Sequence, residues 1–503
     1  MTRGTRADGP AKDRTAAHAP RGAWSTAAWI AGPALFALVS FLGTPITAAG
    51  TPAAFALATA LWMIAWWGTG AVPLWVTALL PLVVFPLAGV HRGAALERAV
   101  SSSGPYLSAY VLLFLGGMAI AAALQETGIH RRISLAILAR TKSSPLHVLA
   151  GVFIATSVLS MWISNTAAAT LVLPIALSLL HEIEPRAGVR ARYAAALVLA
   201  VAWGANVGGI GTKIGTTTNM QLAGFLSARG QEVSFVEFAL IGSGFVLIFV
   251  PLAITVLWRV ARVDAPSSQE IARGISQAIP VADRWSAGER AVAIVFAATA
   301  LAWINAQSIT SFLASTFPTL GLGSRHVEAG AALAAAFVLA VWKPARQDLL
   351  GRESLRALPW SALLLIGGSF ALADGIAASG LAEAIAPGFE RLRTLPPFAQ
   401  SLIVAIVAVS ASAVASNTAT IAILLPLIAA AAPPENALTL LFTATIASSC
   451  DFALPAGTPP NAIAFASGRV PFLVMLRTGA ILDVLAAVVA AAWCALVVDF
   501  VLG

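Results

Sequence analysis

Long apolar segments follow one another along almost the whole chain and are separated by short polar ones. From about residue 24 onward, most apolar segments approach the roughly 20 residues that a helix needs to span a bilayer. No polar segment is long enough to fold as a separate soluble domain. The pattern therefore predicts an all-α polytopic membrane protein with about eleven transmembrane helices. These are expected at 24–43, 52–70, 73–90, 106–128, 193–226, 236–258, 291–316, 327–342, 358–380, 437–468 and 478–498.

Two further apolar segments, 145–180 and 397–430, are interrupted near their midpoints by the triplet Ser-Asn-Thr. These short polar side chains bond to nearby backbone groups and favour turns, which makes them unsuitable for the middle of a lipid-facing helix. Broken backbone at membrane depth is tolerated only where protein or a water-filled cavity surrounds it. We therefore predict two re-entrant helical hairpins, each of which enters the membrane and returns on the same side.

The distribution of Lys and Arg predicts the orientation, because cytoplasmic loops are enriched in these residues. With the N-terminus inside, the predicted inner segments contain 23 basic residues and the outer ones six. Residues 1–23 are then a disordered basic cytoplasmic tail, and the C-terminus lies outside. The first hairpin opens inward and the second outward. We expect a multi-pass protein of the plasma membrane in contact with membrane lipid.

The composition excludes several other classes of protein. Hydrophobic residues make up 59% of the chain and charged residues 10%, far below the ~25% of soluble proteins. The net charge of +8 is not gathered into a basic patch with aromatic residues, so no nucleic-acid partner is expected. Cys450 and Cys494 lie in apolar surroundings and indicate neither a disulfide framework nor a thiolate metal site. No nucleophile–base pair or metal-ligand cluster indicates an enzyme or a bound cofactor.

Three motifs recur in the same order in the two halves of the chain. Leu113–Met118 is echoed by Leu364–Ser369, and Gly215–Asn219 is echoed by Gly457–Asn461. The third repeated motif is the hairpin triplet itself. Since the two hairpins are predicted to open to opposite sides, the halves form an inverted repeat, as in secondary transporters with a midplane substrate site on discontinuous helices. The repeats are predicted at 24–258 and 291–503, joined by a cytoplasmic linker at 259–290.

The repeated motifs have a chemistry that suits anions and cations together. Each Ser-Asn-Thr tip offers hydroxyls, an amide and free backbone groups to a carboxylate, and its carbonyls and helix ends to a small cation. The Gly-rich and Pro-rich motifs are expected to break the helices 193–226 and 437–468 next to these tips. Two facing tips would hold an anion with two carboxylates. The alternatives are Ser and Thr side chains that only bond their own backbone, and a simple proline kink.

Three stretches, Leu159–Thr166, Ser416–Thr418 and Thr458–Ile463, resemble the signature motifs of the divalent anion:sodium symporter family of di- and tricarboxylate and sulfate carriers. The resemblance covers most of the chain from about residue 24. It implies a homodimer in which a scaffold supports mobile transport domains that move by an elevator mechanism. It also implies sodium as the coupling ion and a four-carbon dicarboxylate such as succinate, malate or fumarate as the substrate.

The resemblance also implies which residues form the site. The substrate contacts would be Ser164, Asn165, Thr166, Ser416, Asn417, Thr418, Thr458 and Pro459. The first sodium site would use Ser160, Ser164, Asn165 and Gly215, and the second would use Ser412, Ala415, Asn417 and Gly457.

Lys213 and Asp451 depart from the family pattern and are modulators of charge in this interpretation, because an ionisable residue at membrane depth is a functional candidate. Lys213 is expected to lie beside the anion, to replace a sodium ion, or to pair with Asp451. Replacement of a cation would make the protein a sodium-independent exchanger. Asp374 is a weaker alternative, for proton coupling. Citrate, 2-oxoglutarate and sulfate remain open as substrates, and an anion channel is the alternative to a carrier.

Overall fold

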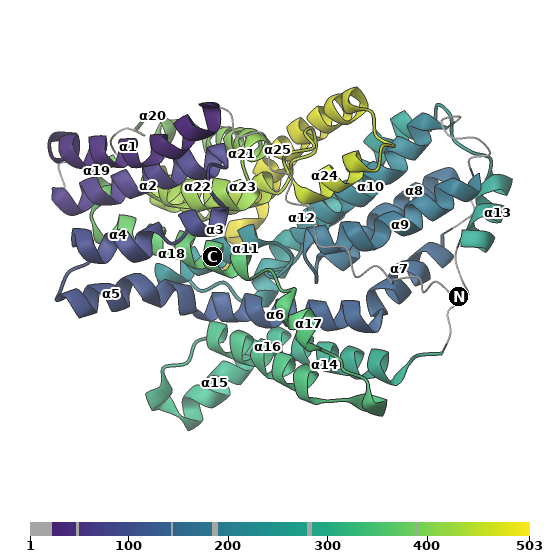
Figure 1. The fold of residues 1–503 in the computed structure, drawn as a ribbon, viewed down its shortest axis with the longest axis horizontal. Coiled ribbons are helices and arrows are strands. Elements are labelled where there is room, and N and C mark those ends of the chain that lie inside the picture. Colours follow the sequence, from purple (N-terminus) through teal and green to yellow (C-terminus); the bar gives the residue numbers. More distant parts are fainter. Residues whose placement is uncertain are drawn as a thin grey trace, which may run out of the picture.

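The computed structural model describes residues 23–46, 50–141, 144–183, 190–278, 284–385, 387 and 390–503. The predicted basic tail lies outside these residues except for Ala23. All regular structure in the described residues is helical (Figure 1). Nine of the described helices are long and apolar enough to cross a membrane. The prediction of an all-α membrane protein is therefore confirmed, and helices lie in all eleven predicted segments.

The described residues of the first half form twelve α-helices before the linker. They are α1 (Ala23–Ile46), α2 (Thr51–Thr69), α3 (Leu74–Thr77), α4 (Leu80–Ala88), α5 (Ala95–Ser103), α6 (Ala109–Thr127), α7 (Ile129–Ala139), α8 (Pro145–Ser160), α9 (Asn165–Ile183), α10 (Ala191–Gly209), α11 (Thr217–Ala228) and α12 (Phe235–Ala261). The linker contains α13 (Ser268–Ala278), which packs against α9.

The second half contains a corresponding set of helices. They are α14 (Ala287–Ile304), α15 (Ala306–Thr316), α16 (Ser324–Val341), α17 (Arg352–Arg356), α18 (Trp360–Ala378), α19 (Leu381–Ile385), α20 (Glu390–Arg393), α21 (Pro397–Val414), α22 (Asn417–Ala431), α23 (Ala437–Ser448), α24 (Pro459–Ala466) and α25 (Phe472–Leu502). The pairs α8–α9 and α21–α22 are the two predicted helix–turn–helix segments, and the members of each pair are in contact. The pairs α10–α11 and α23–α24 are the two predicted broken helices.

Two predicted spans differ from the structure because each contains a break. The segment 73–90 divides into α3 and α4, where Pro81 stands at the start of α4 and has no amide hydrogen to continue a helix from α3. The segment 291–316 divides into α14 and α15 at Asn305. The Asn305 side chain donates to the carbonyl of Leu301 at 2.8 Å, a local bond that competes with the helix.

Glycines allow the helices around the first hairpin to approach closely. Gly204 and Gly208 of α10 face the backbone of α8, where a Cβ on either glycine would collide with the carbonyl oxygen of Phe153 or Ser157. The Ser157 hydroxyl donates to the Gly204 carbonyl at 2.9 Å. Small residues four apart are typical of close helix pairs in membranes. They fix α10, and therefore its broken end, against the hairpin.

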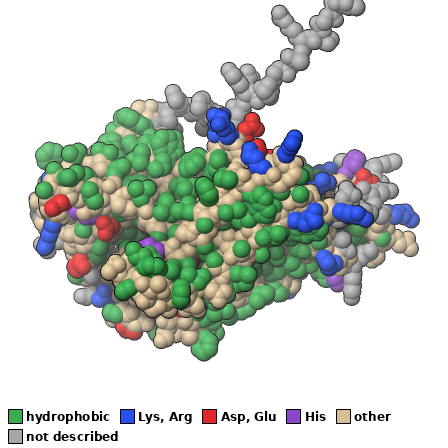
Figure 2. Space-filling view, turned by 90° about the horizontal axis from the view of Figure 1, so that it is seen from below, with side chains coloured by type: hydrophobic (Ala, Val, Ile, Leu, Met, Phe, Trp, Pro, Cys, Tyr) green, Lys and Arg blue, Asp and Glu red, His purple; other side chains and the backbone are tan. Residues whose placement is uncertain are grey.

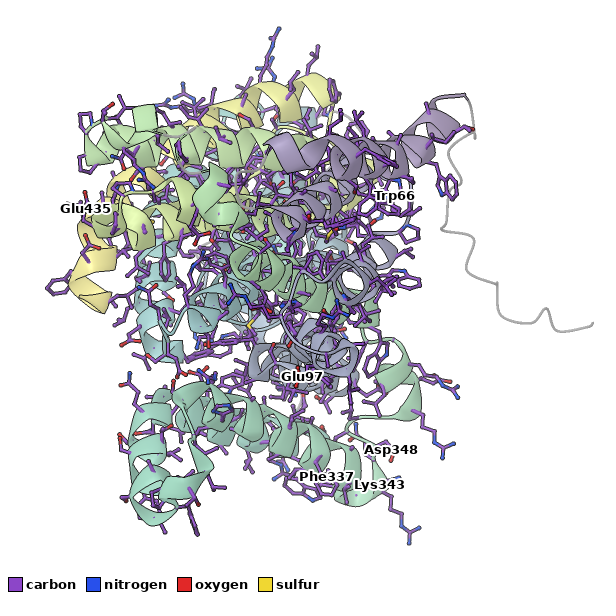
Figure 3. The ribbon with its side chains drawn as sticks, turned by 90° about the vertical axis from the view of Figure 1, so that its left-hand side faces the viewer. Trp66, Glu97, Phe337, Lys343, Asp348 and Glu435 are labelled. Atoms are coloured by element: carbon purple, nitrogen blue, oxygen red, sulfur yellow. The ribbon has the colours of Figure 1, made fainter. Side chains whose placement is uncertain are left out.

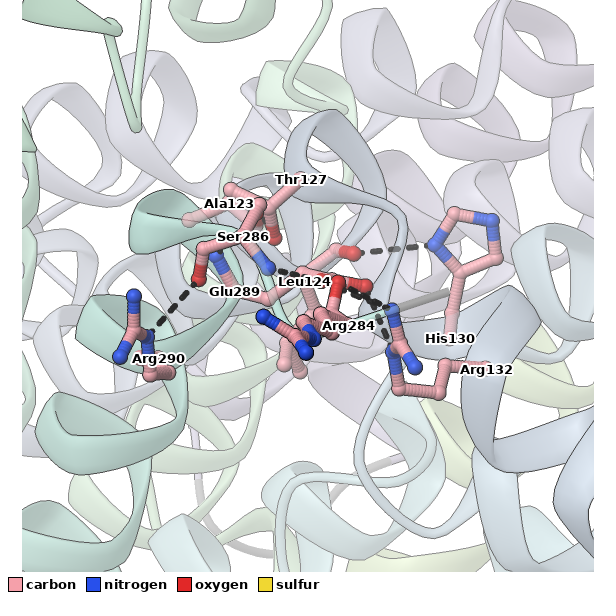
Figure 4. A network of polar contacts seen from close by, with 9 residues as sticks. All are labelled: Ala123, Leu124, Thr127, His130, Arg132, Arg284, Ser286, Glu289 and Arg290. Atoms are coloured by element: carbon pink, nitrogen blue, oxygen red, sulfur yellow. Dashed lines mark hydrogen bonds and ion pairs between the residues drawn. The ribbon is translucent and has the colours of Figure 1, made fainter. Parts of the chain in front are cut away.

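The outer layer formed by α14, α15 and α16 lies along one side of the helical body (Figures 1 and 3). Figure 3 shows Phe337 and Lys343 in this layer and Trp66 of α2 on the opposite side. Near one end of the layer, Arg132 of α7 forms an ion pair with Glu289 of α14 at 2.8 Å (Figure 4). The layer is therefore attached to the body through α7 as well as through α6.

Several basic side chains gather toward one end of the molecule, the end at which α7 and α13 lie (Figures 1 and 2). The exposed arginines in the segments predicted to be cytoplasmic include Arg131, Arg140, Arg192, Arg259, Arg262 and Arg273. This grouping is typical of a cytoplasmic face. The orientation in the membrane stays a prediction.

Candidate functional site

Two of the three repeated motifs lie at the start of a helix in both halves of the chain. The hairpin triplets begin α9 at Asn165 and α22 at Asn417, and the two copies of the other motif begin α11 at Thr217 and α24 at Pro459. The first amide hydrogens of a helix have no partner within it, and the helix dipole places partial positive charge there. A helix start is therefore a ready site for an anionic group. The repeated motifs supply four such starts in two repeat-related pairs, α9 with α22 and α11 with α24.

Contacts between the repeats bring these helix starts together. The hydroxyls of Thr217 on α11 and Thr418 on α22 are 2.5 Å apart, and those of Thr218 and Ser449 are 3.0 Å apart. In the other broken helix, the second part is α24, which packs against α9 and α10 of the first repeat. The broken helix of each repeat therefore meets the hairpin of the other repeat.

The tip of the first hairpin is surrounded by oxygen atoms. Ser160 Oγ lies 2.8 Å from Asn165 Oδ1 and 2.7 Å from the carbonyl oxygen of Ala205 on α10. A Cβ on Gly209 would overlap Asn165 Oδ1, and one on Gly215 would overlap the Gly209 carbonyl. Of the four predicted ligands of the first sodium site, Ser160, Asn165 and Gly215 therefore lie around one point. Hard cations prefer such oxygen ligands.

The tip of the second hairpin repeats this arrangement. Ser412 Oγ lies 2.6 Å from Asn417 Oδ1 and 2.5 Å from the carbonyl oxygen of Ser448 on α23. Gly457 lies against the side chain of Asp451, because a Cβ on Gly457 would overlap that carboxylate. The donor set is again composed of oxygen atoms and suits a small hard cation as a transported substrate.

The two helix breaks are held open by equivalent asparagines. Asn219 Nδ2 donates to the carbonyls of Gly209 and Thr212, at 3.0 and 2.7 Å. Asn461 Nδ2 donates in the same way to the carbonyls of Asp451 and Leu454, at 2.9 and 3.0 Å. Both asparagines satisfy carbonyls that the broken helix leaves without partners. Residue 209 is therefore the structural equivalent of residue 451.

The remaining predicted site residues differ in exposure. Ser164 and Thr166 at the first tip and Pro459 at the start of α24 are exposed, and Ser416 at the second tip is half-buried. Ser164 Oγ accepts a hydrogen bond from the amide of Ala167, at 3.3 Å, and so caps α9. Exposed polar groups at a helix start are available to a ligand.

Ala415 and Thr458 complete the predicted set. Ala415 is half-buried at the end of α21 and has the extended backbone that turns the chain toward α22. Thr458 is buried, and its hydroxyl accepts from the amide of Asn461, at 3.3 Å, and from Asn206 Nδ2, at 3.0 Å. The sequence predicted Thr458 as a substrate contact, whereas here its hydroxyl is bonded within the protein.

Asn206 is a residue of this site that the sequence did not indicate. It is fully buried in α10 and also donates to the carbonyl of Asp451, at 3.2 Å, and to Asn461 Oδ1, at 3.3 Å. It thus connects the first repeat to the broken helix of the second. The only signal in the sequence is a lone amide in an apolar segment, outside the repeated motifs.

Lys213 does not pair with Asp451, so that alternative is wrong. Its ammonium group lies 2.6 Å from Glu328 Oε2 on α16 and 2.7 Å from the carbonyl of Val233, and both side chains are fully buried. Glu328 Oε1 also accepts from the amide of Phe235, at 2.8 Å. The charge of Lys213 is therefore balanced by a helix of the outer layer instead of by a group in the site.

Asp451 is left without a counterion. Its side chain is fully buried, both carboxylate oxygens lack a hydrogen-bond partner, and no ion pair joins it to another described residue. The neighbouring acid, Asp483 of α25, accepts from the amide of Phe452 at 2.8 Å and so positions the unwound segment.

The cavity of about 680 Å³ among the described residues lies elsewhere. It is formed between α6, α11, α16 and α18, and Tyr110, Arg325 and Asp374 contribute to its walls. None of the residues predicted for substrate or sodium lines it. The arrangement of the helix starts, and not the volume of this cavity, identifies the candidate site.

Comparisons with known proteins agree with this architecture. A family model described as citrate transporter matches residues 59–447. The sodium-dependent dicarboxylate transporter SdcS of Staphylococcus saprophyticus is 31% identical over 477 residues, which cover 92% of this chain and 89% of that protein. The protein of the same name from Staphylococcus aureus is 30% identical and covers 86% of this chain and 84% of its own length.

Two solved structures share the fold at low sequence identity. The Alcanivorax borkumensis YdaH transporter aligns with a TM-score of 0.55 and 14% identity, over 85% of this chain and 98% of that one. Neisseria gonorrhoeae MtrF aligns with a TM-score of 0.53 and 13% identity, over 86% of this chain and 95% of that one. These two similarities support the fold alone.

Proposed function

The chain belongs to the citrate transporter family, among the di- and tricarboxylate carriers that its motifs resemble, and we propose that it carries divalent organic anions by sodium-coupled symport. The observation that supports this most is the set of four helix starts in two repeat-related pairs. Two pairs of positive helix ends match an anion with two carboxylates. The oxygen cluster beside each hairpin tip supplies a place for a cation next to each pair.

Four-carbon dicarboxylates such as succinate, malate and fumarate are the proposed substrates. The names of the relatives at about 30% identity support this class, since both are sodium-dependent dicarboxylate transporters. Citrate is the second candidate, because the matching family model is described as citrate transporter. Citrate has a third carboxylate, which would need a further donor beside the two pairs of helix starts.

Sodium coupling is favoured over sodium-independent exchange by the surroundings of Lys213. The exchange hypothesis requires the ammonium group of Lys213 to stand in for a cation at the site. Here that group is neutralised by Glu328 within a fully buried ion pair. The cation positions at the two tips are consequently left to ions from solution.

The proposed mechanism is an elevator movement of hairpins and broken helices, as one domain of a homodimer, against a scaffold that includes the outer layer. The inverted repeat supports it, because such repeats give two related end states around one site. The N-terminus is proposed to lie inside and the C-terminus outside. Labelling of single cysteines introduced at Arg131 and Arg391 from either side of the membrane would test this orientation, with labelling from the cytoplasm expected for the first.

Counterflow in proteoliposomes tests the proposed function directly. Vesicles loaded with unlabelled succinate should accumulate labelled external succinate when sodium is present and much less when choline replaces it. Parallel measurements with citrate and sulfate separate the substrate classes, and an anion channel would show no counterflow. The proposal fails if none of these anions exchanges in the presence of sodium.

A further inference from the structure

We propose that Asp451 provides a charged ligand to the cation at the second hairpin tip, so that the two cation positions differ in charge. This inference rests on the proposed sodium-coupled function. Neither the repeat nor the resemblance assigns a carboxylate to either position, since the predicted ligands are hydroxyls, amides and backbone carbonyls.

The first line of support is that the carboxylate of Asp451 has no partner among the described residues. Asp451 is 0% exposed, and neither of its carboxylate oxygens has a hydrogen-bond donor among the described residues. An ionised carboxylate in such a place is costly unless it is paired or coordinates a metal ion. No Lys or Arg forms an ion pair with it among the residues described. A cation from solution would supply the missing partner.

The second line of support is the direction in which the side chain points. Residue 209 occupies the equivalent place in the first repeat, and the Cβ that Gly209 lacks would overlap the Asn165 amide oxygen. A side chain at that place is therefore directed toward the hairpin tip. In the second repeat the carboxylate of Asp451 lies against Gly457, one of the residues predicted to ligate the second sodium ion.

The neighbouring acid does not serve the same purpose. Asp483 accepts a hydrogen bond from the amide of Phe452, so at least one of its oxygens is engaged with backbone. When it is ionised, Asp483 adds negative charge near Asp451 and increases the attraction that a cation would feel at the second tip. The first tip has glycine at residue 209 and only neutral ligands.

This difference predicts an order of binding. The second position is expected to bind sodium more tightly than the first, because a carboxylate ligand adds a full negative charge in a buried place. Sodium should therefore bind to the substrate-free protein and stabilise it against thermal unfolding. Removal of the carboxylate should weaken this binding, while the neutral first position stays unchanged.

The experiment compares Asp451→Asn with the wild type and with Asp499→Asn, which removes an exposed carboxylate of α25. Sodium is titrated into purified, substrate-free protein with the melting temperature as readout, and into the uptake assay. For Asp451→Asn we expect the half-saturating sodium concentration to rise at least tenfold in both, with a lower Hill coefficient. Asp499→Asn should match the wild type. A second variant, Asp451→Gly, copies the first repeat and should behave like Asp451→Asn.

Sodium curves of Asp451→Asn that coincide with those of the wild type would overturn the inference. Loss of the pH dependence of uptake without a change in the sodium curves would also overturn it, and would assign a proton to Asp451. Failure of the proposed function is a separate result, in which no anion is taken up by the wild type. The melting experiment contains no substrate, so it tests the sodium ligand in that case as well.

Discussion

At the scale of single residues, one asparagine at each hairpin tip organises both the helix start and the oxygen cluster. Asn165 and Asn417 are the first residues of α9 and α22, and their side-chain oxygens lie within 2.8 Å of Ser160 and Ser412. The amide group can thus orient a cation through its oxygen, while its nitrogen stays available to a carboxylate.

We expect Asn165→Ala and Asn417→Ala each to reduce sodium-driven uptake to below about 1% of wild type. Each variant removes an amide group that would bind both the sodium ion and a carboxylate of the anion. The amount and monodispersity of purified protein should be unchanged. Ser311→Ala is the control, since Ser311 is exposed on α15 and its hydroxyl donates to the carbonyl of Gln307 in the same helix, at 3.0 Å. Retention of wild-type uptake by either tip variant would argue against the site.

The buried ion pair of Lys213 and Glu328 is a second feature at this scale. Loss of one partner leaves the other charge buried and unpaired, which costs about 3–5 kcal/mol. We therefore expect Lys213→Met to lower the thermal stability of the detergent-solubilised protein strongly. The double variant Lys213→Met with Glu328→Leu should recover much of the loss, because two apolar side chains then replace the two charges.

The exposed pair of Lys343 and Asp348 offers a matched control. Its atoms are 2.7 Å apart, and both side chains are 58% exposed. Such surface pairs contribute at most about 1 kcal/mol, so Lys343→Met should leave the melting temperature almost unchanged. If Lys213→Met were no more destabilising than Lys343→Met, the buried pair would have no structural role.

Sequence reasoning succeeded where the repeat supplied two copies of the same signal. Ser-Asn-Thr occurs twice, and both copies do end one helix and start another. It failed for Lys213, whose partner Glu328 is 115 residues away and lies just inside a predicted span. It also missed Asn206, because the bonds of that amide depend on how two halves of the chain pack and no local pattern records them.

At the scale of helices, the breaks that a repeated motif marked were predicted from the sequence, whereas the isolated breaks at Pro81 and Asn305 were not. The break after Gly209 follows a run of glycines, which weaken a helix, and the break before Pro459 precedes two prolines, which have no amide hydrogen to donate to the preceding turn. The division between α14 and α15 depends on the side-chain bond of a single asparagine. Helix α7 lies in a segment predicted as a loop, because its 11 residues are too few to span a membrane and two of them are arginines.

Helix α7 connects the outer layer to the body through one ion pair (Figure 4). Arg132 donates from Nε and Nη2 to the two carboxylate oxygens of Glu289, at 2.8 and 3.0 Å, and both side chains are largely buried. The Glu289 carboxylate also accepts from the amide of Ser286 at 2.7 Å and so caps α14. This side chain therefore fixes the start of α14 and its contact with α7 together.

We expect Arg132→Gln to destabilise the protein by about 1.5–3 kcal/mol, the range for hydrogen bonds to charged groups. Thermal unfolding of purified protein measures this loss. Arg290→Gln serves as the control, because Arg290 is exposed and its bond to the Ser286 carbonyl is long, at 3.4 Å. Equal melting temperatures for the two variants would mean that the α7–α14 contact does not depend on the ion pair.

At the scale of the whole molecule, the two repeats interlock through their Gly-Gly motifs. Gly116 of α6 packs against Ala332 of α16, so that the first repeat contacts the outer layer of the second. Gly368 of α18 packs against the backbone of Ala78, between α3 and α4 of the first repeat. In both halves the repeated motif therefore contributes a glycine to a contact with the other repeat, the first glycine of the pair in α6 and the second in α18.

The two adjacent glycines of α6 test this contact between the repeats, because their replacement by alanine is expected to change the stability of the protein in opposite directions. A Cβ on Gly116 would lie 2.5 Å from Ala332 Cβ and 2.6 Å from its backbone carbon, so Gly116→Ala should force α6 and α16 apart and cost about 1–3 kcal/mol. A Cβ on Gly117 would meet nothing closer than 3.7 Å, at Ile214. Gly117→Ala should therefore be neutral or stabilise the helix by up to about 1 kcal/mol. Melting temperatures of the two variants that shift equally would refute a close contact between the repeats at Gly116.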